Sequence, residues 1–136
     1  MTQEDAWNRL GDAGRVLLIG SAVAAPLARK DFSGSFNALT AVLGAAGVSK
    51  AIKAFWKEPR PDGEDRKSFP SQHASERFAA AISLDAAFAD SLGPVAIGGA
   101  TAVALTRLFG RKHRIADVIA GAALGITAGK LAQQLR

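Results

Sequence analysis

The stretch SFPSQHASERF, residues 68–78, lies where a charged loop gives way to an apolar run. Pro70 and Ser71 are typical of the first positions of a helix, because proline needs no N–H there and a serine hydroxyl can accept from a free backbone N–H. We therefore predict a helix from Ser71 to Asp90, with Ser71 as its N-cap. The apolar run gives no reason for Ser71 or His73, so the polar residues elsewhere in the chain must be considered with them.

The rest of the chain shows helical patterns and no convincing alternation of the kind that predicts a strand. The segment that follows residue 57 carries prolines and a Pro-Asp-Gly turn, which end a helix and predict a loop. The sequence thus predicts a single all-α domain, residues 1–136, folded as an antiparallel bundle of about five to six helices. The other expected elements are a short amphipathic helix over 3–12 lying at a membrane interface, an apolar segment over 16–28, and helices over 35–57, 94–109 (with Gly110 as C-cap) and 112–133.

The composition lies between those of soluble and membrane proteins. Hydrophobic residues make up 49% of the 136 residues and charged residues 21%, and the mean hydropathy is +0.12. The longest uncharged stretch, residues 32–49, is slightly shorter than the roughly 20 residues that cross a bilayer. Gly121, Gly125 and Gly129 recur every four residues, a spacing that lets helices approach closely in membranes. We favour a membrane-embedded bundle over a soluble one.

The net charge of +5 suits a nucleic acid, an anionic membrane surface or a phosphorylated substrate. Nucleic acid is the least favoured, since the basic residues fall at helix ends and are not interleaved with exposed aromatic side chains. The chain has no cysteine, which excludes disulfides and thiolate metal sites. A cleaved signal peptide is not favoured either, because the leading segment is long and acidic.

Polar residues gather at the ends of the predicted helices. If the helices run up and down, these ends meet on one face of the bundle and bring together three cations, two imidazoles, a hydroxyl and a carboxylate. The chain has only two histidines, and both belong to this group. Its members are Lys53, Arg60, Ser71, His73, Arg107, His113 and Asp117.

This group has the chemistry of phosphoryl transfer. The three cations form an anion site, which the N–H groups at the start of the helix at Ser71 would extend. His113 and Asp117 are four residues apart, so on one helix they share a face and are predicted to hydrogen-bond, leaving the other imidazole nitrogen as a nucleophile. His73 is then the proton donor for a leaving oxygen. The expected reaction proceeds through a phosphohistidine, with no metal and no cofactor.

Three spaced segments closely resemble the three-part signature of the type 2 phosphatidic acid phosphatase (PAP2) superfamily, written KxxxxxxRP, PSGH and SRxxxxxHxxxD. They occur in the family's order and define a motif core over residues 53–117. The segments are Lys53-x6-Arg60-Pro61, Pro70-Ser71-Gln72-His73 and Thr106-Arg107-x5-His113-x3-Asp117.

The resemblance implies a role for each motif residue: His113 as nucleophile, Asp117 as its partner and His73 as the acid. Two positions depart from the family pattern. Thr106 replaces a serine and keeps the hydroxyl, whereas Gln72 replaces a glycine whose N–H meets the phosphate in the family, which puts full activity in doubt. The phosphate-binding set implied by the resemblance is Lys53, Arg60, Ser71, Gln72 and Arg107.

The resemblance also implies a metal-independent hydrolase that acts on a lipid phosphate or diphosphate through a phosphohistidine. Its expected partners are the phosphorylated lipid and membrane lipids, with self-association left open. The expected location is a bacterial inner membrane, with the site on the extracytoplasmic face. Two alternatives remain: a catalytically impaired member that binds anionic lipid or acts as a scaffold, and a vanadate-dependent haloperoxidase, which the small size of the chain disfavours.

Overall fold

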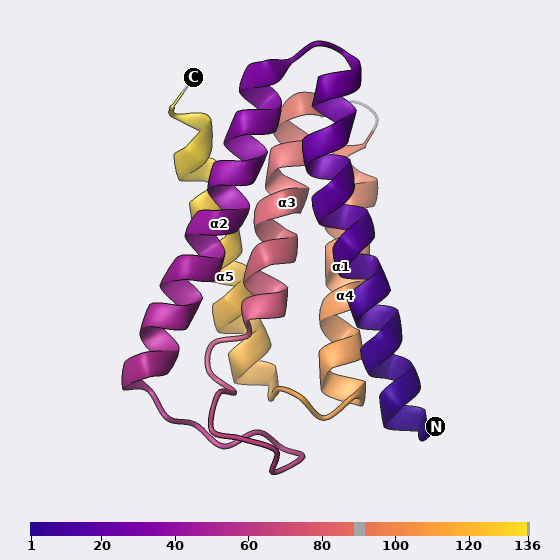
Figure 1. Cartoon of the computed structure of the whole chain (residues 1–136), viewed down its shortest axis with the longest axis vertical. Helices are drawn as coiled ribbons and strands as arrows, with labels where there is room; N and C mark the ends of the chain where they lie inside the picture. Colours follow the sequence, from indigo (N-terminus) through magenta and orange to yellow (C-terminus); the bar gives the residue numbers. More distant parts are fainter. Residues whose placement is uncertain (89–91, 136) are drawn as a thin grey trace.

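The computed structural model describes residues 1–88 and 92–135, and these fold as an antiparallel bundle of helices (Figure 1). The prediction of an all-α bundle is confirmed, and the described residues contain no β-strand beyond an isolated bridge between Glu58 and Lys67. The five helices are α1 (Gln3–Ala28), α2 (Phe32–Phe55), α3 (Gln72–Phe88), α4 (Gly93–Phe109) and α5 (Ile115–Gln133).

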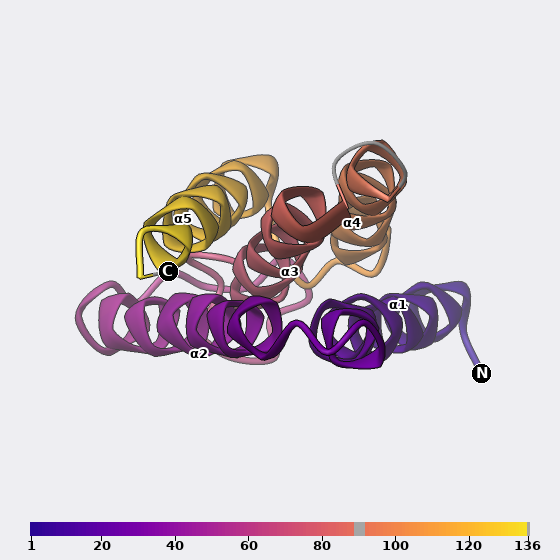
Figure 2. The same cartoon turned by 90° about the horizontal axis from the view of Figure 1, so that it is seen from above.

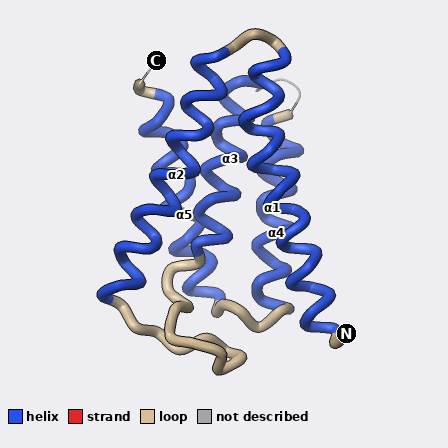
Figure 3. The backbone as a smooth tube through the Cα atoms, in the orientation of Figure 1, coloured by secondary structure: helices blue, strands red, loops and turns tan. Residues whose placement is uncertain are grey.

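Seen from above, α1 and α2 form one row, and α3, α4 and α5 lie behind it (Figure 2). Helix α3 contacts each of the other four helices. It begins at the end of the bundle that carries the two longer loops, residues 56–71 and 110–114, and the N-terminus lies at the same end (Figure 3). Residues at the start of α3 are therefore surrounded by groups from the whole bundle.

The first helix differs from the prediction. Residues 3–12 are not a separate interfacial helix but the first turns of α1, which is 26 residues long and begins with a capping box between Thr2 and Asp5. These turns pack on α4, where the rings of Trp7 and Phe109 lie 4.9 Å apart. Gly14, between the two predicted segments, does not interrupt the helix, because packing against neighbouring helices outweighs its low helix propensity.

The last helix starts later than predicted, at Ile115 rather than at Lys112. Arg111 has a positive φ of 56°, and Arg114 is extended as the N-cap. The carboxylate of Asp117 accepts from the backbone N–H of Arg114 at 2.7 Å, a hydrogen bond that closes the first turn of the helix. His113 therefore precedes the helix on which Asp117 lies.

The other boundaries agree more closely with the sequence. Helix α2 begins three residues earlier than predicted, with Asp31 as its N-cap, and Gly110 is the C-cap of α4 as predicted. The hydroxyl of Ser71 accepts from the backbone N–H of Ala74 at 3.2 Å, in agreement with its predicted capping role. The predicted end of α3 at Asp90 lies outside the described residues.

Small side chains fill the interior of the bundle. Alanines dominate the buried core, and the glycines at 121, 125 and 129 bring α5 directly onto α3. A Cβ at Gly121 would lie 2.3 Å from the carbonyl oxygen of Ser71, and one at Gly125 would lie 2.1 Å from that of Ser75. The four-residue glycine spacing is thus a close helix contact, as in membrane bundles.

Large apolar side chains lie mostly on the outside. The side chains of Val16, Leu17, Phe36, Val95 and Ile119 are each more than half exposed. Helices α1, α2 and α5 are long and apolar enough to cross a membrane. A bundle with alanine and glycine inside and large aliphatic residues outside is suited to a hydrocarbon solvent, which indicates a membrane protein.

Candidate active site

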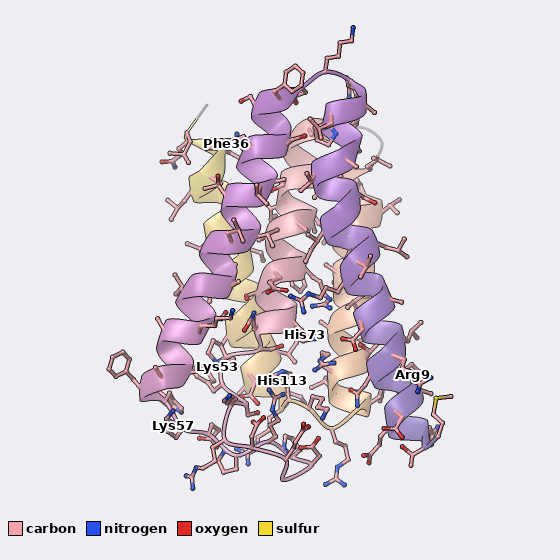
Figure 4. The ribbon with its side chains drawn as sticks, viewed as in Figure 1. Arg9, Phe36, Lys53, Lys57, His73 and His113 are labelled. Atoms are coloured by element: carbon pink, nitrogen blue, oxygen red, sulfur yellow. The ribbon has the colours of Figure 1, made fainter. Side chains whose placement is uncertain are left out.

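The predicted site residues lie together at the loop end of the bundle. Figure 4 shows His73 and His113 near this end, with Lys53 on the last turn of α2 at a similar level. His73 is on the first turn of α3, and His113 is in the loop between α4 and α5. Motifs that lie far apart in the sequence therefore meet at one end of the bundle.

The long loop before α3 is tied to the shorter loop after α4. The backbone N–H of Asp62 donates to the carbonyl of Arg111 at 3.1 Å, and the guanidinium of Arg111 donates to the carbonyl of Pro61 at 3.0 Å. Lys112 pairs with Asp62 at 3.0 Å and also with Glu64. The hydrogen bond to Glu64 raises the pKa of the Lys112 ammonium, which keeps this loop pairing charged.

Arg60 is held at the junction of the two loops. Its Nε donates to Asp65 at 2.7 Å, and its Nη1 donates to the carbonyl of Lys112 at 3.2 Å. The same Nη1 lies 3.5 Å from Nε2 of His113. The guanidinium is thus fixed beside the imidazole, where it can stabilise an anion attached to that nitrogen.

His113 is buried, with 3% of its surface exposed. Its Nδ1 lies 2.7 Å from the main-chain carbonyl oxygen of Ser68. A carbonyl oxygen only accepts, so Nδ1 carries the hydrogen, and Nε2 carries the unprotonated lone pair of a nucleophile, which faces Nη1 of Arg60. Burial, then the charges of Arg60 and Arg107, lower the pKa of the His113 imidazole to about 3, so the ring is neutral at physiological pH.

Asp117 does not occupy the position predicted for it. We expected its carboxylate to hold His113 directly across one helical turn, but His113 lies before the helix and its Nδ1 faces the Ser68 carbonyl. The carboxylate of Asp117, which is 2% exposed, instead accepts from the Ser68 hydroxyl and from the N–H of Arg114. Asp117 is therefore linked to His113 through Ser68.

Ser71 and Gln72 join the loop to α3. Ser71 is fully buried, and its N–H donates to the main-chain oxygen of Asp117 at 2.9 Å. The amide of Gln72 donates to Glu76 at 2.9 Å, so the side chain runs along α3. Gln72 has no positive φ, so its backbone does not need the glycine found in the family signature.

A pocket of about 620 Å³ opens among α1, α3, α4 and the two loops. Arg107 lines it, is 5% exposed, and has a buried Nε with no hydrogen-bond partner among the described residues. A buried guanidinium nitrogen without a partner is costly unless an anion binds there. The other lining residues are Asn8, Asp12, Arg15, Val16, Arg60, Glu64, Asp65, His73 and Lys112.

Lys53 is not among the residues that line this pocket. Its ammonium donates to the carbonyl of Lys67 at 2.7 Å and to that of Pro70. In this arrangement it fixes the loop before α3, and two of its three donors are occupied. Of the predicted site residues, the structure brings Arg60, His73 and Arg107 into the lining of this pocket. Lys53 anchors the loop before α3, and Ser71, Gln72, His113 and Asp117 are not among the lining residues. His113 lies next to the pocket, since its Nε2 is 3.5 Å from the Arg60 guanidinium.

Sequence reasoning missed the contribution of α1. Asp12 and Arg15 both line the pocket; Oδ1 of Asp12 lies 3.2 Å from Nε2 of His73, and Arg15 pairs with Glu76 at 2.9 Å. The available signal is a pair of opposite charges one turn apart, directly before the apolar run that begins at Val16. It is hidden when residues 3–12 and 16–28 are treated as separate elements. Ser68 was also missed, because its main-chain carbonyl carries no sequence signal.

The fold and the site define a membrane helical bundle with a cationic, histidine-containing pocket at one end. The model of the PAP2 superfamily matches residues 34–136, three quarters of the chain. The protein belongs to this superfamily, as the three motifs predicted.

The chain is similar to two known proteins. Over 88 residues the chain is 32% identical to a lipid A 1-phosphatase of Porphyromonas gingivalis; the match covers 62% of this chain but only 20% of that protein. The crystal structure of Aquifex aeolicus LpxE matches with a TM-score of 0.81 at 18% identity, over 96% of this chain and 85% of that one. At this identity the second match shows the shared fold.

Proposed function

We propose that the protein hydrolyses a phosphate ester of a membrane lipid through a phosphohistidine on His113. The observation that carries the proposal is the tautomer of this histidine. Its Nδ1 donates to the Ser68 carbonyl, so Nε2 is unprotonated and its lone pair faces the Arg60 guanidinium, which a phosphoryl oxygen would attract in the reaction. The unpartnered Nε of Arg107 supplies a second donor for the phosphate. Two arginines around a free imidazole nitrogen stabilise the charge that develops in phosphoryl transfer.

The reaction has two balanced steps. In the first, Nε2 of His113 attacks phosphorus, an N–P bond forms, and the P–O bond to the alcohol breaks as His73 gives its proton to the leaving oxygen. In the second, a water loses a proton to His73 and attacks phosphorus, and the N–P bond breaks to release phosphate. The arginines neutralise the phosphoryl oxygens throughout, so the mechanism needs no metal ion.

An apolar groove supports a lipid substrate. It has a volume of about 510 Å³ and is lined chiefly by α1 and α4. Thr106 in the groove and Arg107 in the phosphate pocket are consecutive residues, and α1 contributes to both. A phosphate bound at Arg107 would leave an attached hydrocarbon chain free to enter the groove. The lipid A 1-phosphatase relative acts, by its name, on a phosphorylated lipid, which agrees with this substrate class.

The proposal is tested by phosphate release in detergent with a chelator present. The substrates are lipid A, phosphatidic acid, phosphatidylglycerophosphate and an isoprenyl diphosphate, and the control is His113→Ala. We expect chelator-resistant release from at least one lipid, absent in the variant, and an acid-labile phosphoenzyme when the reaction is quenched early. No release from any of them would favour the alternative of a binding or scaffolding protein. Gln72 does not favour that alternative, since its side chain is bonded to Glu76.

We also propose that the protein lies in a bacterial inner membrane with the site on the extracytoplasmic face. Since the chain has no cysteine, single cysteines give a clean test. Arg66→Cys lies in the exposed part of the loop before α3, and Ser33→Cys is exposed at the opposite end of the bundle. In intact spheroplasts a membrane-impermeant maleimide should label Arg66→Cys and spare Ser33→Cys; the reverse pattern would place the site in the cytoplasm.

A further inference from the structure

We propose that Asp12, on α1, is a positioning residue that turns the imidazole of His73 toward the phosphate pocket and favours its protonated form. The inference rests on the phosphatase mechanism proposed above. Asp12 lies outside the segment matched by the family model, which begins at residue 34. It belongs to none of the three motifs, so neither the motifs nor the family model assigns it a role.

The contact is direct. Oδ1 of Asp12 lies 3.2 Å from Nε2 of His73, and both residues line the pocket with Arg107. The side chain of Asp12 is 63% exposed and that of His73 is 23% exposed, so the pair lies at the mouth of the pocket. In the proposed reaction, a leaving alcohol that binds at this mouth replaces Asp12 as the acceptor of the Nε2–H and takes its proton.

The helix that carries Asp12 is fixed to α3 on both sides of this contact. The carbonyl of Gly11 accepts from the Arg77 guanidinium at 3.1 Å, and Arg15 pairs at 2.9 Å with Glu76, whose side chain is 3% exposed. Three successive interactions thus join residues 11, 12 and 15 to the first turns of α3. They hold the carboxylate in place although its side chain is exposed.

The charges around His73 make such a carboxylate useful. The groups that face the imidazole are Arg15 on α1, Arg77 on α3, Arg107 on α4 and His113 in the following loop. Burial and then three guanidinium groups disfavour a positive imidazole, yet the proposed acid must carry a proton before the P–O bond breaks. A carboxylate at hydrogen-bond distance offsets this repulsion. When the ester cleaves, the N–H bond of His73 breaks, an O–H bond forms on the leaving alcohol, and Asp12 remains ionised.

The test compares leaving groups, because acid assistance matters most when the leaving oxygen is basic. Phosphate release is measured from a short-chain phosphatidic acid, whose leaving group is an alkoxide, and from p-nitrophenyl phosphate, whose leaving group needs little protonation. We expect Asp12→Asn to lower release from the lipid by roughly 10- to 100-fold, which is at or below the lower end of what acid catalysis usually contributes. Release from the aryl phosphate should change less than about threefold. His73→Gln should likewise lower release from the lipid more than release from the aryl phosphate. The double variant with Asp12→Asn should be no slower on the lipid than His73→Gln alone.

Two further variants separate positioning from packing. Arg15→Gln breaks the pairing with Glu76 but keeps the carboxylate of Asp12. It also removes one of the three guanidinium groups that disfavour a protonated His73, so the ratio of the lipid rate to the aryl rate should stay the same or rise, whatever happens to the two rates themselves. Asp12→Glu keeps a carboxylate and should restore most of the ratio. If Asp12→Asn fails to fold, which its melting curve would show, Asp12→Ser provides a smaller neutral residue for the same comparison.

The outcomes are distinct. Equal loss on both substrates in the neutral Asp12 variants, or no loss on either, would overturn the role of Asp12 while an inactive His113→Ala kept the phosphohistidine mechanism. A wild-type protein that releases no phosphate, or a His113→Ala variant that remains active, would overturn the mechanism and the role of Asp12 together.

Discussion

Nδ1 of His113 lies 2.7 Å from the main-chain carbonyl oxygen of Ser68, 45 residues earlier in the chain. The hydroxyl of the same Ser68 donates to Asp117. One residue of the loop before α3 thus connects the carboxylate and the imidazole of the third motif, which do not meet directly. The loop is therefore part of the site, and its conformation decides which nitrogen of His113 carries the hydrogen and which carries the lone pair.

This connection predicts that Ser68 and Asp117 act as one unit. Ser68→Ala removes the hydroxyl but keeps the carbonyl, so we expect it to lower phosphate release by about tenfold, the equivalent of about 1.4 kcal/mol. Asp117→Asn should have a larger effect, because the Asp117 carboxylate also accepts from the backbone N–H of Arg114 and so stabilises the start of α5. The double variant should be no slower than Asp117→Asn, since both changes break the same chain of contacts.

The measurement is a double-variant cycle on the rate, with melting temperatures recorded for each variant. Ser83→Ala is the matched control: Ser83 is a buried serine on α3 whose hydroxyl donates to a carbonyl of its own helix, away from the pocket lining. Its rate should be unchanged. Additive losses from Ser68→Ala and Asp117→Asn would show that Asp117 reaches His113 by another route.

The low pKa of His113 predicts its titration. Its pKa falls from an ordinary value of 6.5 to about 3, through burial and the charges of Arg60 and Arg107. In the His73→Gln variant, His113 is the only histidine that remains, so its ¹⁵N resonances can be followed without overlap. Between about pH 5 and 8 we expect no change in protonation, with the hydrogen on Nδ1. A midpoint near 6.5 would contradict the buried, arginine-facing environment.

The same shift affects stability. Between pH 6.5 and about 3 the unfolded chain binds a proton at this histidine that the folded protein does not. The folded state therefore loses stability as the pH falls through this window. His113→Gln in the His73→Gln background should flatten this part of the dependence of melting temperature on pH. If the dependence is unchanged, the acid-sensitive groups lie elsewhere.

Much of the fold followed from local patterns. Apolar periodicity, turn residues and the Pro-Ser helix start predicted an antiparallel helical bundle, and the three motifs were placed at helix ends that meet. The starts of helices were less predictable, because they depend on caps supplied by tertiary contacts. Arg111, with its positive φ, delays α5 until Ile115, and nothing in the local sequence forces that conformation.

The site was predictable where motif spacing carried it and unpredictable where distant backbone atoms did. The carbonyl of Ser68 reaches His113 only through the packing of the loop, and the charges of Asp12 and Arg15 reach the pocket only through the packing of α1. Gln72 was predicted from its motif position alone. Its contact with the phosphate stays a prediction; the structure adds a partner that the motif does not contain, since the Gln72 amide donates to Glu76 on the same helix.

The glycine seam predicts opposite effects of alanine on two helices. A Cβ at Gly125 would lie 2.1 Å from the backbone oxygen of Ser75, whereas one at Gly44 would meet nothing within 4 Å. Gly125→Ala must push α5 away from α3 and should destabilise the protein by roughly 1–3 kcal/mol. Gly44→Ala should be neutral or stabilising by up to about 1 kcal/mol, because alanine is the better helix former. Unfolding in detergent measures both, and equal effects would contradict the close α3–α5 contact.

The apolar groove predicts a difference between two neighbouring glycines of α4. Gly99 lines the groove, whereas Gly98 does not, and a Cβ at Gly98 would meet nothing within 4 Å. A leucine at Gly99 would fill space near Leu18, where the proposed substrate chain lies. We expect Gly99→Leu to raise KM for a long-chain lipid phosphate by about tenfold or more while p-nitrophenyl phosphate, which has no chain, is hydrolysed at the normal rate. Gly98→Leu should change neither. Equal behaviour of the two variants on the lipid would move the hydrocarbon chain out of this groove, because only Gly99→Leu narrows it.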